Sequence, residues 1–256
     1  MKDFSEVAGV KVSLNNFKLM YDSEEYPVEQ AAREYTDAVD VYLEKNSHKQ
    51  ILYWMYRYFE AKKDRKLFDS FGMEYDLTVI KNGKIGNEYI KTVGHYHSNL
   101  KGKEVSYPEV YEVLEGNIQY ILQTRFENGK VDVIIVKTEQ GDKVIVPPNY
   151  GHVSVNVGDT VALSSNIQKG DLPHNADYDS FKENGGAAIY VTDEGVINNP
   201  KYKIGKIRTV RPVEKPEFAL TKESSLYESF KKNPEKFDFL IHPDKYDFSS
   251  VFQDIE

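Results

Sequence analysis

The sequence contains no cysteine, a single tryptophan and no long uncharged apolar run. Without cysteine the chain has no disulfide and no thiolate metal site, which fits a reducing compartment. No stretch approaches the roughly 20 apolar residues of a membrane span, and the N-terminal residues lack the apolar core of a signal peptide. We therefore expect a soluble cytoplasmic protein without a membrane partner.

The sequence also has fewer basic than acidic residues. Lys and Arg number 33 against 41 Asp and Glu, which gives a formal charge of -8 and a pI near 5.4. No Lys/Arg-rich face is evident, so the broad phosphate contact of a nucleic-acid-binding protein is not expected. The 256 residues can bury a sizeable core in one or two domains.

The first third of the chain gives mixed structural signals. An alternating piece at 10–14 predicts an edge strand, and apolar residues at helical spacing predict one or two short helices between 28 and 45. The aromatic and branched run at 51–59 predicts a buried strand. A charged segment follows it and predicts a short helix ended by Gly72.

From about residue 75 the pattern becomes one of short strands separated by Gly, Asn and Pro, with turns expected at 82–83, 115–117 and 128–129. This rhythm is typical of an all-β sandwich or barrel. Past Pro212, regularly spaced aromatic residues predict a docked tail with short helices near 222–239. We expect an N-terminal strand and helical segment (1–50), a barrel domain (51–212) and a C-terminal tail (213–256).

The most informative side chains are His95, His97, Glu109 and His152. A His-x-His pair on a strand directs both rings to the same side, because side chains alternate with period two. Imidazole and carboxylate are the usual nitrogen and oxygen ligands of divalent first-row metals. The pattern predicts one metal site.

The segments that carry these residues resemble the two signatures of the cupin superfamily. The matching positions are His95, His97, Glu109 and Gly116 in the first segment, and Gly141, Pro147, His152 and Asn156 in the second. Asn149 stands where glycine is usual, and Asn tolerates the left-handed conformation better than most residues. The resemblance implies an all-β cupin jelly-roll barrel with N-terminal and C-terminal helical additions.

The resemblance narrows at residues 78–88, 92–97, 108–116, 121–123 and 146–152. Together these runs look like those of the archaeal-type, cupin glucose-6-phosphate isomerases, over about residues 53–178. That family interconverts glucose 6-phosphate and fructose 6-phosphate in glycolysis and gluconeogenesis. The resemblance implies a phosphosugar substrate and a homodimer formed through the N-terminal strand. Tolerance for mannose 6-phosphate stays open.

The resemblance also implies roles for individual residues. One divalent ion, Fe(II) or Mn(II), with Zn(II) or Ni(II) as alternatives, would be held by His95, His97, Glu109 and His152 and would bind adjacent sugar oxygens. Glu109 would have a second role as the base of an enediol route. A metal-assisted hydride shift is the competing route, and the sequence leaves both open.

Substrate contacts implied by the resemblance are Tyr53, Thr78, Thr92, Gly94 and Tyr178, and the implied catalytic residues are Glu109, Tyr111 and His174. Strict alternation puts Thr92 on the face opposite His95, so Gly94 must bend the strand if both face one pocket. Tyr111 shares the parity of Glu109. A family histidine aligns with either His174 or Ala176.

Two other functions use the same ligand set. An Fe-dependent cupin dioxygenase would favour an apolar pocket without the phosphate-binding set of Thr78, Thr92 and Gly94. A non-catalytic sugar-phosphate-binding cupin would be expected to carry degraded ligands, and here they are intact. Both comparisons favour the isomerase.

Overall fold

The computed structural model describes residues 1–45, 49–125, 130–170 and 177–255. Its strands are β1 (Lys2–Asp3), β2 (Ser13–Asn15), β3 (Lys18–Met20), β4 (Glu29–Glu34), β5 (Ile51–Arg57), β6 (Met73–Ile80), β7 (Lys84–Ile85), β8 (Glu88–Tyr89), β9 (Glu109–Glu115), β10 (Ile118–Thr124), β11 (Lys130–Lys137), β12 (Lys143–Val146), β13 (Tyr150–Asn156), β14 (Ala162–Lys169), β15 (Ile189–Thr192), β16 (Gly195–Asn198), β17 (Lys203–Pro212) and β18 (Phe252–Asp254). The helices are α1 (Ser5–Ala8), α2 (Tyr35–Ala38), α3 (Arg65–Phe71), α4 (Asp179–Glu183) and α5 (Leu226–Lys232), with 3-10 turns η1 (Val39–Val41), η2 (Pro216–Phe218), η3 (Pro234–Leu240) and η4 (Pro243–Lys245).

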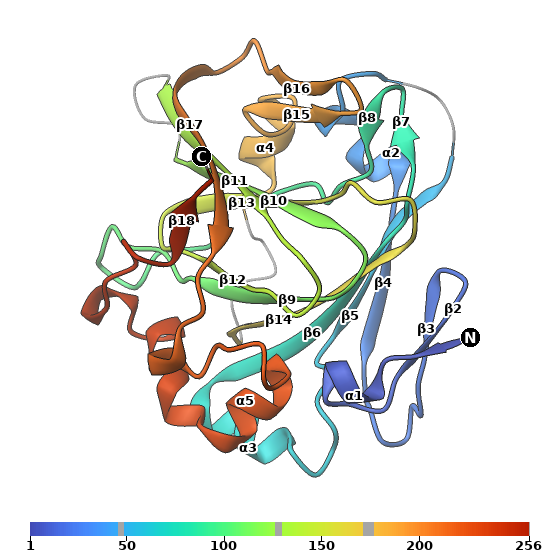
Figure 1. Cartoon of the computed structure of the whole chain (residues 1–256), viewed down its shortest axis with the longest axis vertical. Helices are drawn as coiled ribbons and strands as arrows, with labels where there is room; N and C mark the ends of the chain where they lie inside the picture. Colours follow the sequence, from blue (N-terminus) through green and yellow to red (C-terminus); the bar gives the residue numbers. More distant parts are fainter. Residues whose placement is uncertain (46–48, 126–129, 171–176, 256) are drawn as a thin grey trace.

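Two large sheets form the body of the molecule (Figure 1). One has six strands in the order β12-β9-β14-β6-β5-β4, and the other has five in the order β13-β10-β11-β17-β18. The turn between β9 and β10 crosses from the first sheet to the second at Gly116, whose φ of 82° is the left-handed conformation that glycine tolerates. The expected all-β cupin fold is confirmed, in the form of two sandwich-like sheets rather than a closed barrel.

Alternation along β9 shows how the six-stranded sheet uses its two faces. Tyr111 and Val113 belong to the core cluster that includes the strands of the five-stranded sheet. Val110 and Leu114 point the other way, into a second cluster with the N-terminal segment and the C-terminal helices. The site therefore lies on the inner face, and the tail covers the outer one.

The C-terminal tail is ordered by its aromatic residues. Phe230 on α5 and Phe237 and Phe239 on η3 are fully buried, and α5 lies beside α3 (Figure 1). The ring of Phe230 is 4.4 Å from that of Phe68 on α3. The predicted docked helices near 222–239 are confirmed, as is α3 ending at Gly72.

The expectations for the N-terminal region hold in part. The sequence predicted one or two short helices between 28 and 45. The structure has two short helices there, α2 and η1, but residues 29–34 form strand β4, paired antiparallel with β5. The edge of β5 offers backbone partners that outweigh a weak helical preference. The strand predicted at 10–14 begins only at Ser13, and it belongs to a small sheet with β1 and β3. The turn predicted at 128–129 lies outside the described residues.

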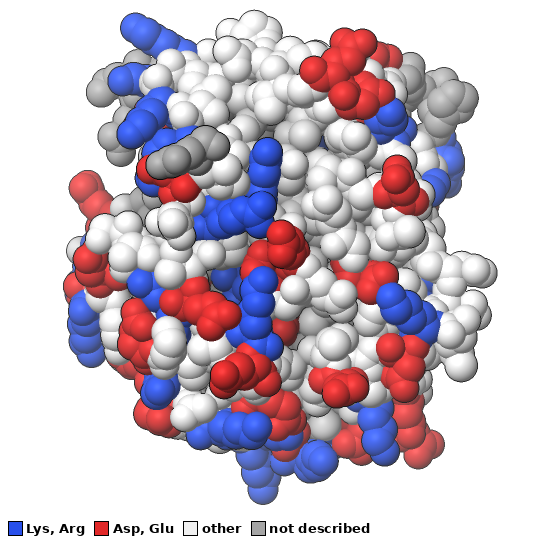
Figure 2. Space-filling model, viewed as in Figure 1, with Lys and Arg blue, Asp and Glu red and all other residues white. Residues whose placement is uncertain are grey.

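No helix in the described part of the chain is long and apolar enough to cross a membrane. On the face in Figure 2, the blue Lys and Arg side chains and the red Asp and Glu side chains are interspersed over the lower half. Neither sign forms a continuous field on this face among the described residues.

Candidate metal and substrate site

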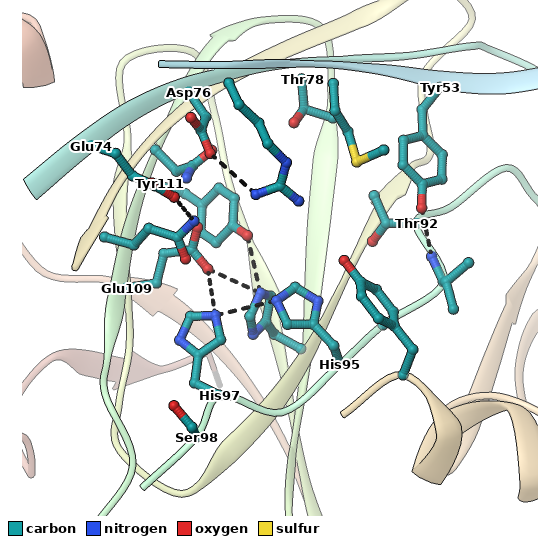
Figure 3. A pocket seen from close by; sticks show the side chains of 18 residues that line it. Tyr53, Glu74, Asp76, Thr78, Thr92, His95, His97, Ser98, Glu109 and Tyr111 are labelled. Atoms are coloured by element: carbon teal, nitrogen blue, oxygen red, sulfur yellow. Dashed lines mark hydrogen bonds and ion pairs between the residues drawn. The ribbon is translucent and has the colours of Figure 1, made fainter. Parts of the chain in front are cut away.

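Four side chains that the sequence singled out meet on the inner face of the six-stranded sheet. One ligand atom from each of His95, His97, Glu109 and His152 lies within 4.8 Å of the others. Nε2 of His95 is 3.2 Å from Nε2 of His97, and Oε2 of Glu109 is 3.4 Å from Nε2 of His97 and 3.1 Å from Nε2 of His152. Figure 3 shows His95, His97 and Glu109 converging at one end of the pocket.

These residues come from three places in the fold. Glu109 is the first residue of β9, and His152 lies on β13 of the other sheet. His95 and His97 lie in a stretch that makes only isolated β-bridges. The prediction of a regular strand in that stretch is therefore wrong. His95 and His152 exchange two backbone hydrogen bonds, of 3.3 and 3.1 Å. This pairing holds the two imidazoles together across the sheet edges.

Gly94 bends the backbone of that stretch, as the sequence analysis predicted. Its φ is +86°, and a Cβ atom there would lie 2.6 Å from Cγ2 of Val153 and 2.7 Å from Cδ1 of Phe181. The bend lets Thr92 and His95 line one pocket despite their parity. Glycine is needed here both for the left-handed backbone and for the close packing.

Burial keeps His95 and His97 neutral. It lowers the pKa of His97 to about 4, against the opposing pull of Glu109, and it lowers the pKa of His95 well below its usual value, helped by the neighbouring histidines. Burial alone would raise the pKa of Glu109, but His152 and His97 outweigh it and lower that pKa. At neutral pH His95 and His97 therefore offer imidazole lone pairs and Glu109 offers a carboxylate, the forms that bind a metal.

Two residues around the ligands orient them. Nδ1 of His97 lies 3.0 Å from the carbonyl oxygen of Tyr107, and an Nδ1–H donated there leaves Nε2 as the lone-pair nitrogen. The Tyr111 hydroxyl lies 3.0 Å from Nε2 of His152. Burial, with Glu109 nearby, raises the pKa of Tyr111 well above its usual value, so it stays a phenol.

The donor set fits a divalent first-row ion. Two atoms that share such an ion at about 2.1 Å are no more than about 4.2 Å apart, so this cluster is nearly assembled without one. Three neutral nitrogens and one carboxylate leave a dication with a net positive charge. The ligand roles of these four side chains remain predictions.

The predicted substrate contacts lie around the same pocket, which measures about 840 Å³ with its opening to solvent. Tyr53, Thr78, Thr92, Gly94 and Tyr178 all line it. In Figure 3, Thr78, Thr92 and Tyr53 face the cavity on the side away from Glu109 and His97. His174 and Ala176, the two alternatives for the family histidine, lie outside the described residues.

The sequence analysis missed a group of polar residues in this pocket: Arg57, Glu74, Asp76, Asn166 and Gln168. Two signals could have found them. Glu74 and Asp76 share the parity of Thr78, so they face the same side of β6. Asn166 and Gln168 also share one parity, so they face the same side of β14.

Comparisons with known proteins identify the family to which this chain is similar. The family described as Glucose-6-phosphate isomerase (GPI) matches residues 31–208, which is more than half of the chain. The glucose-6-phosphate isomerase of Thermococcus onnurineus is 33% identical over 156 residues, 60% of this chain and 74% of that relative. That of Pyrococcus abyssi is 27% identical over 207 residues, 78% of this chain and 99% of the relative.

Among solved structures, an oxalate decarboxylase of Bacillus subtilis with Mn(II) centres has a TM-score of 0.33 at 18% identity, over 51% of this chain and only 28% of that one. The family match and the fold of two facing sheets define a cupin-type sugar-phosphate isomerase. The chain belongs to the glucose-6-phosphate isomerase family.

Proposed function

We propose that this protein is a metal-dependent aldose–ketose isomerase that interconverts glucose 6-phosphate and fructose 6-phosphate. The observation that carries the proposal is one pocket that joins the cluster of three histidines and Glu109 to a set of hydroxyl-bearing side chains. The first part suits the two oxygens of the reacting carbons, and the second suits a phosphate.

The metal end would act on C1 and C2 of the open-chain sugar. His95, His97, Glu109 and His152 would hold one Fe(II) or Mn(II) ion, with Zn(II) or Ni(II) as alternatives. Such an ion would supply the positive charge that stabilises negative charge on the two oxygens. The reaction moves one hydrogen between C2 and C1 and one proton between their oxygens, so atoms and electrons balance without a co-substrate.

Protein side chains would position the substrate and move protons. The Tyr111 phenol, protonated at neutral pH, can donate a hydrogen bond to a sugar oxygen beside His152. The hydroxyls of Thr78 and Thr92, the backbone N–H of Gly94 and the phenols of Tyr53 and Tyr178 would bind the phosphate end. His174 keeps its proposed role from the family resemblance.

Two reaction routes are open, an enediol route in which Glu109 acts as the base and a metal-assisted hydride shift. A solvent-isotope experiment distinguishes them. A carboxylate whose pKa is lowered is a weak base, so base action requires Glu109 to be free to take the C2 proton. Turnover in D₂O would place deuterium on carbon if a base carries the proton. A direct hydride shift would leave the carbon-bound hydrogen unexchanged.

The experiment that tests the proposed function starts from chelator-stripped protein. Fe(II), Mn(II), Zn(II) and Ni(II) are added back separately, and conversion of fructose 6-phosphate to glucose 6-phosphate is followed. Restored turnover supports the proposal and ranks the ions. Measured metal binding without turnover by any ion overturns it, and an oxygen-consumption assay then tests the dioxygenase alternative.

We further propose that the protein is a homodimer that works in the cytoplasm, in glycolysis and gluconeogenesis. Each chain would be organised as an N-terminal segment (1–50), a barrel domain (51–212) and a C-terminal tail (213–256). The family match supports the reaction step, and light scattering tests the dimer. A molar mass near 29.5 kDa in solution would reject it.

A further inference from the structure

A patch of polar side chains in the pocket has no role in the function proposed above. We call it the polar wall, and it consists of Arg57 on β5, Glu74 and Asp76 on β6, and Asn166 and Gln168 on β14. Asp76 stands directly opposite Asn166 in the β6–β14 ladder, and Glu74 stands opposite Gln168. The wall is therefore a continuous patch on three neighbouring strands.

The ladder registers place this patch between the two ends of the proposed site. Gln168 is also opposite Glu109 on β9, and Asn166 is opposite Tyr111. On β6, Thr78 follows Asp76 at the same parity, so it continues the patch toward the phosphate end. Figure 3 shows Glu74 and Asp76 on the same side of the cavity, between Glu109 and Thr78.

The wall is too deeply buried to be an ordinary polar surface. Glu74 is 3% exposed and Asp76 is 6% exposed, and burial raises the pKa of both carboxyl groups. Oε1 of Glu74 accepts a 2.6 Å hydrogen bond from Nε2 of Gln168. Its other oxygen, Oε2, is buried and has no hydrogen-bond partner within the described residues.

An orphaned carboxyl oxygen in a pocket costs stability, by about 1–3 kcal/mol for an unsatisfied buried polar group. Apolar residues at this inner face would fold at least as well, so the polar wall calls for a function rather than a packing role. A ligand that supplies a donor to Oε2 of Glu74 would remove the cost.

Arg57 gives the polar wall hydrogen-bond donors that a ligand could use. Its Nη1 is 4.0 Å from Oδ2 of Asp76, which is longer than a hydrogen bond. Oδ1 of Asp76 instead accepts a 2.9 Å hydrogen bond from the backbone N–H of Tyr58. The guanidinium is thus kept near Asp76 while donors remain for a molecule in the cavity.

The combination selects one class of ligand group. Two acidic side chains would disfavour a phosphate, and a guanidinium beside them would disfavour a second metal ion. A hydroxyl group both donates and accepts, so it suits a surface where carboxyl oxygens, amides and a guanidinium alternate. An open-chain sugar phosphate has several such hydroxyls between its reacting end and its phosphate.

We propose that the polar wall binds the C3 to C5 hydroxyls of the sugar phosphate and determines which hexose 6-phosphates the pocket accepts. This inference rests on the proposed function, because the metal and phosphate ends fix which carbons face the wall. The carboxyl groups of Glu74 and Asp76 exchange hydrogen bonds with the hydroxyls, and Arg57 donates to them. A site built in this way discriminates strongly against an analogue that lacks the hydroxyls.

The test uses non-reacting ligands, so that it does not depend on turnover. Calorimetric titration of metal-loaded protein compares glucitol 6-phosphate, its 3,4-dideoxy analogue and inorganic phosphate. The wild type should bind glucitol 6-phosphate at least about tenfold more tightly than the dideoxy analogue, the effect of one or two hydrogen bonds. Equal affinities would overturn the proposal, and this arm needs no variant.

Variants locate the effect. Glu74→Gln and Asp76→Asn should each bring the affinity ratio of the two ligands close to one, while metal content and phosphate affinity stay at wild-type values. The matched control is Glu60→Gln, a buried carboxyl outside the pocket, which should keep the wild-type ratio. The wall is rejected if the variants keep that ratio, if the control loses it, or if metal and phosphate binding fall in parallel.

The two proposals can fail separately. If the protein distinguishes the two ligands but does not convert fructose 6-phosphate, the proposed role of the polar wall stands and the proposed isomerase activity is rejected. If it converts fructose 6-phosphate but does not distinguish the ligands, the isomerase activity stands and the role of the polar wall is rejected.

Discussion

The Tyr111 hydroxyl oxygen lies 3.0 Å from Nε2 of His152, although the two residues are 41 positions apart in the chain. Tyr111 belongs to the six-stranded sheet and His152 to the five-stranded sheet. Their contact joins the two sheets within the pocket. The site therefore depends on how the two sheets face each other.

Tyr111→Phe removes the hydroxyl but keeps the ring. We expect kcat to fall by roughly tenfold or more, as for the loss of one hydrogen bond to a charged group, with metal content unchanged. The measurement is steady-state kinetics together with metal analysis of the same sample. Loss of metal in step with activity would assign Tyr111 to ligand support instead.

Glu109→Ala should remove the one anionic ligand of the cluster. Outer partners of metal ligands are worth about 10–100-fold in affinity, so we expect a loss of at least about 100-fold for this ligand. Competition with a chromophoric chelator measures it, with the exposed Glu29→Ala as control. Unchanged metal content and affinity would falsify the shared site.

Thr92→Val tests the phosphate end. Oγ1 of Thr92 accepts a 3.0 Å hydrogen bond from the N–H of Ser154, which leaves its own proton for a ligand. We expect KM for fructose 6-phosphate to rise by about tenfold, far more than any change in metal content. Thr92→Ser, which keeps the hydroxyl, should restore most of the affinity, and equal loss of metal and substrate binding would contradict the assignment.

Gly94→Ala should destabilise the fold, because the new Cβ would lie 2.6 Å from Val153 Cγ2. Overpacking of this kind costs about 1–3 kcal/mol. The matched control is Gly102→Ala, where φ is also positive, at +76°, but a Cβ would meet nothing within 4 Å. Thermal unfolding of both variants isolates the steric part, and equal changes in Tm would show that packing at Gly94 is unimportant.

Glu60 predicts a pH dependence of stability. Burial raises its pKa to about 7, despite Arg65 and the N–H of Tyr75, from 4.5. Between these values the folded state holds a proton that the unfolded state has lost, so the free energy of unfolding decreases as pH rises from about 4.5 to 7. The slope for one group is at most about 1.4 kcal/mol per pH unit.

Glu60→Gln cannot titrate and should flatten that decline. Urea unfolding at pH 5 and pH 8 measures the difference between wild type and variant. The variant should gain stability relative to wild type at the higher pH. A difference that is the same at both values would show that Glu60 is ionised throughout.

Local patterns in the sequence determined a large part of the fold. The short strands from β9 to β14 follow period-two alternation and turn residues such as Gly116, which act over a few positions. Between 28 and 45 the sequence predicted one or two short helices, and α2 and η1 form there, but residues 29–34 instead pair as β4 with the edge of β5. A preference read from one segment contains nothing about such a distant partner.

One part of the candidate site could likewise be predicted from the sequence, and the other part could not. Histidines 95, 97 and 152 and Glu109 stand out in the sequence, because chelation requires particular residue types at recognisable spacings. Glu74, Asp76, Asn166 and Gln168 carry no such signature. Only the pairing of β6, β14 and β9 brings them into one wall, since ladder register aligns residues that are far apart in the chain. The sequence by itself determined the chemistry of the proposed metal ligands, and the tertiary structure decided what surrounds them.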